Sequence, residues 1–177
     1  MANRSYLYSA DSMPTEDENP KAIRCISEHN WDVPLAHKLM AGYETTIVPS
    51  MIWSPRICIA ADYAGGADLL RDLLRVVGHG LGGDAEFAEC VAKTTSHLEK
   101  QRARYFLLET GEMVSLTNDD PVAGVQRLVS DDIPAAVAQA KAAIAGENDD
   151  WLASIRTDWQ EHFASFYSDT LYFSFPG

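Results

Sequence analysis

A short, uninterrupted apolar run at residues 57–61 constrains the fold more than any other feature of the sequence. A strand that is apolar on both faces must be covered on both faces, as a central strand of a sheet is. After Gly65 and Gly66, apolar residues recur at helical spacing from Leu69 to Val77, with charged residues between them. This pattern predicts an amphipathic helix that packs on the sheet.

The rest of the chain predicts strands and helices in alternation. Further strands are expected at 6–8, 45–48, 105–108 and 171–175. Helices are expected over 34–40, 69–77, 84–102, 121–129, 131–146 and 148–166. Strands scattered among helices indicate an α/β or α+β fold, with a small mixed sheet of about four strands and five or six helices packed on it. The 177 residues are expected to form a single domain spanning 1–177.

The charge balance is strongly acidic. The chain has 26 acidic and 14 basic residues, which gives a formal net charge of −12. Residues 115–177 carry ten acids and three bases, a net of −7. A negative field repels phosphate backbones, so nucleic acid is not an expected partner. It attracts a basic protein partner, although acidic surfaces also serve simply to keep a protein in solution.

The cysteines and the hydropathy pattern predict a cytoplasmic protein. Cys25, Cys58 and Cys90 cannot all pair within one chain, and Cys58 and Cys90 lie in apolar or helical patterns typical of buried thiols. No apolar segment follows the first residues, so no signal peptide is expected. No stretch reaches the roughly 20 apolar residues of a membrane helix, so no membrane partner is expected either.

Patterns that could carry catalysis or bind a cofactor are incomplete. The glycines of 78–83 follow a helix and precede Asp84 and Glu86, whereas a phosphate loop follows a strand and ends in lysine with serine or threonine. Cys25 with His29, and Cys90 with His97, supply only two ligands each, so neither metal nor other cofactor is expected. No Gly-x-Ser-x-Gly motif is present.

One carboxylate pair could perform acid–base chemistry. Glu28 and Asp32 lie four residues apart beside Trp31, and an aromatic wall can raise the pKa of a carboxyl group. The alternative is a turn into the helix at 34–40, with Asp32 as its cap and Trp31 in the core. Aromatic residues of the last thirty positions would likewise form either a partner interface or one buried helix face.

The opening residues 1–9, with the stretch Ser27-Glu28-His29-Asn30-Trp31-Asp32-Val33-Pro34-Leu35, resemble the start of a family of uncharacterised bacterial proteins. Members of that family begin with the same residues and carry a similar Ser-Glu-x-x-aromatic-Asp-x-Pro stretch. The resemblance continues through 62–63 and 105–109 and implies no established activity. In size and acidity the chain also resembles, in type only, immunity proteins that neutralise secreted bacterial toxins.

The first function expected is that of a non-catalytic binding protein, in concrete terms an immunity protein that neutralises a cationic bacterial toxin. Its carboxylates would imitate the anionic substrate of a secreted toxin domain, and an aromatic side chain would anchor the contact. The candidate partner-binding residues are Asp119, Asp120, Asp131, Asp132, Asp149, Asp150, Glu28 and Asp32. At least one acid in each of the three aspartate pairs is expected to cap a helix.

The alternative is a small enzyme or ligand-binding protein with a site assembled from distant residues. Glu28, Asp32 and a histidine are then the first candidates. A deep pocket that holds those groups would favour this alternative, whereas a shallow acidic face would favour the binding protein. A homo-oligomeric structural protein is also left open.

Overall fold

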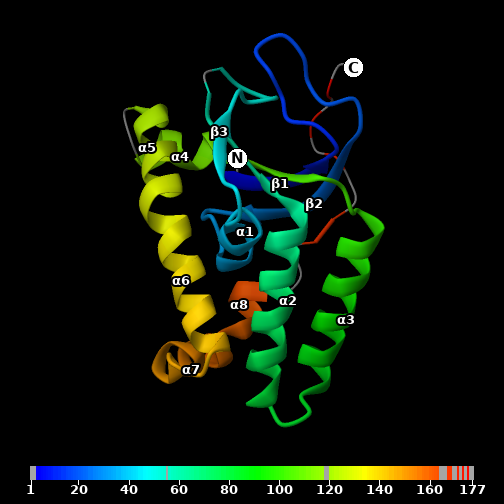
Figure 1. Cartoon of the computed structure of the whole chain (residues 1–177), viewed down its shortest axis with the longest axis vertical. Helices are drawn as coiled ribbons and strands as arrows, with labels where there is room; N and C mark the ends of the chain where they lie inside the picture. The colour runs from blue at the N-terminus through cyan, green and yellow to red at the C-terminus, as the bar shows by residue number, and fades with distance from the viewer. Residues whose placement is uncertain are drawn as a thin grey trace.

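The computed structural model of the chain describes residues 3–54, 56–117, 120–163, 167, 168, 171, 173 and 175. It contains a five-stranded sheet with the order β2-β1-β5-β4-β3 (Figure 1). The strands are β1 (Arg4–Ala10), β2 (Ile23–Asn30), β3 (Thr46–Val48), β4 (Cys58–Asp62) and β5 (Tyr105–Glu109). Every neighbouring pair is antiparallel. The expectation of a mixed sheet of about four strands is therefore corrected to an antiparallel sheet of five.

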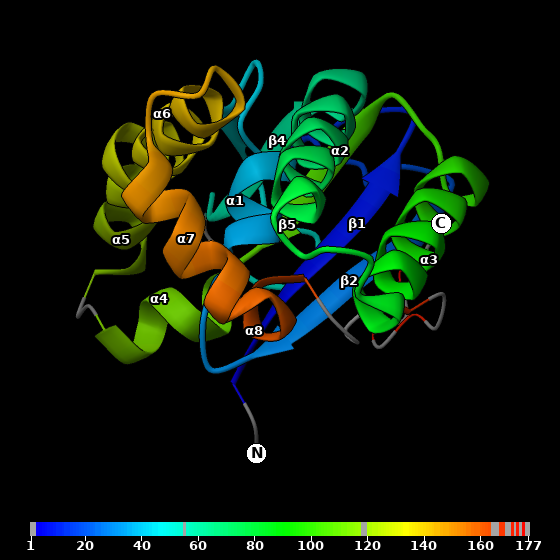
Figure 2. The ribbon, with the colours of Figure 1, turned by 90° about the horizontal axis from the view of Figure 1, so that it is seen from below.

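The helices gather on one face of the sheet (Figure 2). They are α1 (Leu35–Met40), α2 (Tyr63–His79), α3 (Ala85–Lys100), α4 (Gly111–Thr117), α5 (Pro121–Arg127), α6 (Ile133–Ile144), α7 (Asp149–Thr157) and α8 (Trp159–Phe163). They outnumber the five or six expected. Helices segregated on one side of an antiparallel sheet make the fold α+β.

The middle of the sheet is buried on both faces, as the apolar run at 57–61 predicts. Ile57, Ile59 and Ala61 lie in the core beneath the helices. Cys58 and Ala60 lie in a second apolar cluster on the opposite face. Loop residues before β2 and before β4 cover that second cluster, so loops replace helices on this side.

Strand β2 is the element that the sequence does not predict. Its residues are mostly polar, and a β-bulge interrupts its pairing opposite the Leu7/Tyr8 step. A bulge shifts the alternation of side chains between the two faces, so the period-two signal cancels along the strand. The strand expected at 171–175 lies partly outside the described residues, and Leu171, Phe173 and Phe175 are not in a strand.

Helices α5 and α6 are joined into one rod by a turn of π-helix, η1 (Leu128–Asp132). The amide of Ile133 bonds to the carbonyl of Leu128, five residues earlier. Pro134 accounts for this turn, because proline lacks an N–H and its ring clashes with the carbonyl four residues before it in a regular α-helix. The two helices expected at 121–129 and 131–146 are thus one rod, and the aspartates of η1 lie midway along it.

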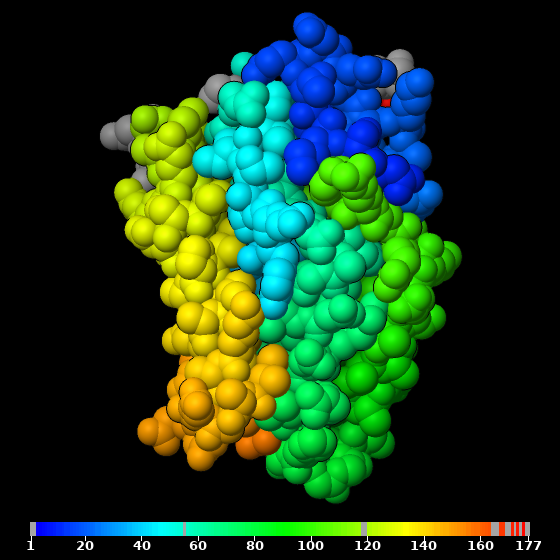
Figure 3. Space-filling model, viewed as in Figure 1, coloured from blue at the N-terminus to red at the C-terminus, as the bar shows by residue number. Residues whose placement is uncertain are grey.

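Helix α2 packs closely against α1 and against α6 of the rod. At Gly66 any side chain would clash with the backbone carbonyl of Met40. Between α2 and the rod, the ring of Tyr43 lies against Gly65, with the ammonium of Lys141 4.9 Å from its centre. Figure 3 shows the cyan segment between α1 and β3 filling the space between the yellow rod and the green α2.

Two further expectations are corrected. The last helix, expected across 148–166, is broken at Asp158 into α7 and α8. Trp31 is not in the core: its side chain is 63% exposed, and its backbone has a left-handed φ of 69°. Within the described residues, no helix combines the length and apolarity needed to cross a membrane.

The close approach at Gly66 predicts a local sensitivity to an added methyl group. We expect Gly66→Ala to lower the free energy of unfolding by about 1–3 kcal/mol, because neither backbone can yield. Gly78→Ala on the same helix is the control, since its methyl would meet only ring carbons of Phe87, the nearer at 3.1 Å. Urea unfolding measures both, and equal midpoints for the two variants would contradict the packing at Gly66.

Candidate binding cleft

A cleft of about 580 Å³ opens where α1, α6, α7 and α8 meet, at the end of the helical layer shown in Figure 2. The end of β2, the segment leading into α1, the first half of α6 and the two last helices form its walls. Its polar, charged and aromatic lining residues are His29, Asp32, Lys38, Asp132, Gln139, Trp151, Glu161 and His162.

The alternation of side chains along β2 decides which residues reach the cleft. Glu28 pairs in register with Tyr6, whose ring lies in the cluster on the face away from the helices. The carboxylate of Glu28 is 3.6 Å from the guanidinium of Arg4. His29 points to the opposite face and lines the cleft with Asp32. The structure therefore does not bring together the candidate pair Glu28 and Asp32.

The cleft has an excess of negative charge. Asp32, Asp132 and Glu161 contribute three carboxylates against the single ammonium of Lys38. The aromatic ring of Trp151, half-buried at the start of α7, forms part of the same wall. An aromatic face flanked by carboxylates is suited to a cation, which both groups attract.

Two histidines face the cleft in their neutral form. Burial lowers the pKa of His29 below its usual value, and the nearby Asp32 opposes part of that shift. Burial also lowers the pKa of His162, against the opposing charges of Asp158 and Glu161. Neither imidazole therefore adds positive charge near pH 7, and each can accept one hydrogen bond and donate another.

Most of the candidate aspartates keep their carboxylates available. Asp120 caps α5 by accepting from two backbone amides, as expected for one member of its pair. Asp131 and Asp132 lie within the rod and make no capping bond, which corrects that expectation. Asp149 and Asp150 lie in the first turn of α7, where no side chain caps the helix. The last four, Asp131, Asp132, Asp149 and Asp150, are exposed and make no hydrogen bond or ion pair to any described residue.

The candidate aspartates do not converge on one site. Asp132 and Asp32 line the cleft, whereas Asp131, its neighbour in η1, is not in the lining. Asp120 begins α5 at the far end of the rod from α7 (Figure 1). Asp119 lies outside the described residues. Sequence reasoning missed Lys38 and Glu161 as site residues, and no local signal could have found them, because only tertiary packing brings α8 beside α1.

A buried histidine fixes the wall that carries Asp32. The ring of His37 is fully buried, with Nδ1 3.0 Å from Ser5 Oγ and Nε2 2.7 Å from Ser27 Oγ. Ser5 donates its hydroxyl proton to the carbonyl of Asp32 at 2.9 Å. His37 therefore donates through Nδ1 and accepts through Nε2. Burial, with a smaller contribution from His29, lowers the pKa of His37 to about 3.

Among the described residues, no group of three or more histidine, cysteine, aspartate or glutamate side chains is placed to hold a metal ion. Asp32 is further tied to the backbone, because its Oδ1 accepts from the amide of Val33 at 2.7 Å. The distinguishing features of the cleft are its negative charge, its aromatic wall and its two neutral imidazoles. These groups can bind a cation, and His29 beside Asp32 can also exchange a proton.

Comparison with known protein families identifies the family of this chain. A family model described as Domain of unknown function (DUF7822) matches residues 11–148, and the chain belongs to that family. Comparisons with curated proteins and with solved structures give no match. The matched residues include Asp32, Lys38 and Asp132 of the cleft, whereas α7 and α8 lie beyond them.

The lowered pKa of His37 predicts a pH-dependent stability. The unfolded chain binds a proton on His37 below about pH 6.5, whereas the folded protein does not until about pH 3. Stability is therefore lost as the pH falls through this window, by about 2 kcal/mol between pH 6.5 and pH 5. His37→Gln keeps a donor and an acceptor, and we expect it to flatten this loss in urea unfolding. Exposed His79→Gln is the control, and parallel curves for all three proteins would refute the assignment.

Proposed function

We propose that this protein, as a member of that family, is a binding protein that holds a cationic group of a protein partner in its acidic cleft. The observation that supports the proposal is that Asp32, Asp132 and Glu161 line the same cleft as the half-buried Trp151. The most concrete form of this function is that of an immunity protein, which would occupy the basic surface of a bacterial toxin.

The cleft suits an arginine side chain in particular. A guanidinium can stack its planar face on an indole ring and donate hydrogen bonds to carboxylates in the same plane. Asp132 has no competing interaction with a described residue, so binding would break no bond to it within the protein. Glu161 is also exposed and lines the same cleft, so the cleft offers a guanidinium more than one carboxylate.

The charge of the whole molecule supports the same kind of partner. The net charge is −12, and residues 115–177 contribute −7 of it. Those residues include η1, α7 and α8, which form one side of the cleft. A field centred on the binding side accelerates the encounter with a basic protein and orients it.

A second candidate function is that of a small enzyme or ligand-binding protein. The specific observation in its favour is that His29, Asp32 and His162 line one cleft. A neutral imidazole beside a carboxylate can act as a general base. A turnover by the purified protein that disappears in His29→Gln would favour this second function over the first. Glu28 has no part in it, because its side chain lies on the other face of the sheet.

The cleft predicts weak binding of an isolated cation. We expect N-acetyl-arginine amide to change the fluorescence of Trp151 in a saturable way and Asp132→Asn to weaken that binding about fivefold, equivalent to about 1 kcal/mol. Exposed Asp17→Asn removes the same charge from the loop between β1 and β2, outside the cleft lining, and is the matched control. N-acetyl-leucine amide should not bind, and equal responses to both amides would contradict the proposal.

The proposal also predicts how a protein partner should behave. Three baits are compared in a pull-down from the native host: the wild type, Asp131→Lys with Asp132→Lys, and the control Asp17→Lys with Glu18→Lys. The partner is the protein retained by the wild type and the control but lost by the cleft variant. Its association rate constant should fall at least tenfold between about 20 and 200 mM NaCl. An association rate constant that does not change with salt would contradict the electrostatic part of the proposal.

A further inference from the structure

Trp31 exposes more of its side chain than any other large apolar residue in the described part of the chain. The side chain is 63% exposed, at the point where β2 has ended and the chain turns toward α1. Within the described residues its indole makes no hydrogen bond and no ring contact. Tryptophan is among the side chains that gain most from burial, and most of that gain is unused within this chain.

The backbone of Trp31 is also in an unfavourable conformation. Its φ of 69° lies in the left-handed region, where the Cβ atom of a non-glycine residue crowds the following carbonyl oxygen. Glycine and asparagine adopt this conformation at lower cost. Packing of a mostly exposed ring within the chain offsets little of the strain. Strained residues of this kind cluster at functional sites, which indicates a role for the ring outside the fold.

Hydrogen bonds hold the chain in place on both sides of Trp31. The amide of Trp31 donates to the carbonyl of Asn3 at 2.7 Å. The hydroxyl of Ser5 donates to the carbonyl of Asp32 at 2.9 Å, and Asp32 Oδ1 accepts from the amide of Val33 at 2.7 Å. The strained backbone is therefore fixed before any partner arrives, and a residue held in this way loses little conformational freedom on binding.

Trp31 adjoins the acidic cleft. Asp32, the next residue, and His29, two residues earlier, both line the cleft. Consecutive Cα atoms are only about 3.8 Å apart. A standard protein interface covers about 800 Å² on each partner, a patch roughly 30 Å across. A protein partner that places a cation in the cleft would therefore also cover Trp31.

A second exposed apolar side chain lies at the same edge of the sheet. Leu116, in α4, is 57% exposed. The peptide group between Asn3 and Arg4 is bonded toward both residues. Its carbonyl accepts from the amide of Trp31, and its amide donates at 2.8 Å to Glu112, one helical turn before Leu116. Figure 2 shows α4, the end of β2 and the start of β1 together at one edge. An apolar surface of a partner matches this edge.

We propose that Trp31 anchors the partner: a large apolar side chain of the partner packs on the indole while a basic side chain of the same partner enters the cleft. Tryptophan is enriched among the residues that dominate the free energy of protein association. The inference rests on the proposed function, because the basic residue must bind in the cleft. It adds that the partner carries a large apolar residue close to that basic residue, which a merely basic protein need not have.

Two substitutions at Trp31 separate the effect of the ring from that of the backbone. Trp31→Asn removes the ring and relieves the strain, whereas Trp31→Phe keeps an aromatic ring on the same backbone. We expect the urea midpoint of Trp31→Asn to equal or exceed that of the wild type, because asparagine tolerates the left-handed region and only a mostly exposed ring is lost. A midpoint clearly below those of the wild type and Trp31→Phe would show that the ring serves the fold, and would overturn the inference.

Synthetic peptides test the binding itself. Acetyl-Arg-Gly-Gly-Gly amide is compared with the three peptides in which leucine replaces one of the glycines. The indole N–H resonances of the four tryptophans are followed by NMR, and those of Trp31 and Trp151 are identified by their loss in Trp31→Phe and Trp151→Phe.

We expect all four peptides to shift the resonance of Trp151. With leucine at one of the three positions, the resonance of Trp31 should also shift in a saturable way, and the dissociation constant should fall by about threefold. This gain should be lost in Trp31→Asn and kept in Trp31→Phe. The same peptides with glutamate in place of arginine are the control and should shift neither resonance.

Several outcomes would overturn the inference. They are no gain from leucine at any position, a gain that persists in Trp31→Asn, or an equal shift of Trp31 by the glutamate peptides. A wild-type dimer that Trp31→Asn converts to monomer in sedimentation would also overturn it, because a second copy would then cover the ring. If the arginine peptides shift Trp151 alone, only this inference is refuted; if no peptide shifts Trp151, the cleft function fails and the inference fails with it.

Discussion

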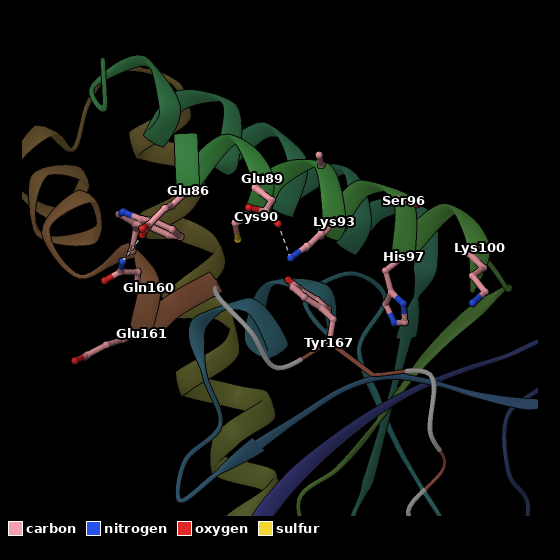
Figure 4. Close-up of a pocket in the computed structure, with 12 residues that line it drawn as sticks. Glu86, Glu89, Cys90, Lys93, Ser96, His97, Lys100, Gln160, Glu161 and Tyr167 are labelled. Carbon is pink, nitrogen blue, oxygen red and sulfur yellow. Dashed lines mark hydrogen bonds and ion pairs between the residues drawn. The ribbon is translucent and has the colours of Figure 1, made fainter. Parts of the chain in front are cut away.

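Burial of both faces of the central strands is the constraint on which the rest of this structure depends. The helices cover one face and loops cover the other, so all the helices pack on the same side of the five-stranded sheet. The short helices α7 and α8 lie at one end of that layer (Figure 1). The cleft and a second cavity, which runs along α3 (Figure 4), both have residues of α8 in their lining.

Buried polar side chains with satisfied hydrogen bonds lie on both faces of the sheet. His37 joins Ser5, Ser27 and, through Ser5, the backbone of Asp32, so the strand end that leads into the cleft is held from beneath. On the other face, the buried carboxylate of Glu109 accepts from Ser50 and from the amide of Met51. Groups whose hydrogen bonds are satisfied in this way stabilise one arrangement over its alternatives.

Pro134 links local backbone chemistry to the proposed function. The π-turn that it causes places Asp131 and Asp132 in the middle of the rod. Neither side chain caps a backbone amide there. Their carboxylates are left to solvent or to a partner, and Asp132 lines the cleft with the aromatic wall. A π-turn of this kind often marks a functional position in a helix.

The sequence by itself determined the buried strand at 57–61, the amphipathic helix α2, the cap and proline that start α5, and the acidic balance of the last third. These features depend on residues close together in the chain. Tertiary structure decided the rest, including β2, whose bulge hides its alternation, and the separation of Glu28 from Asp32 by the two faces of the sheet. It also decided the cleft, because Trp151 and Glu161 meet α1 and the rod only through packing between distant segments.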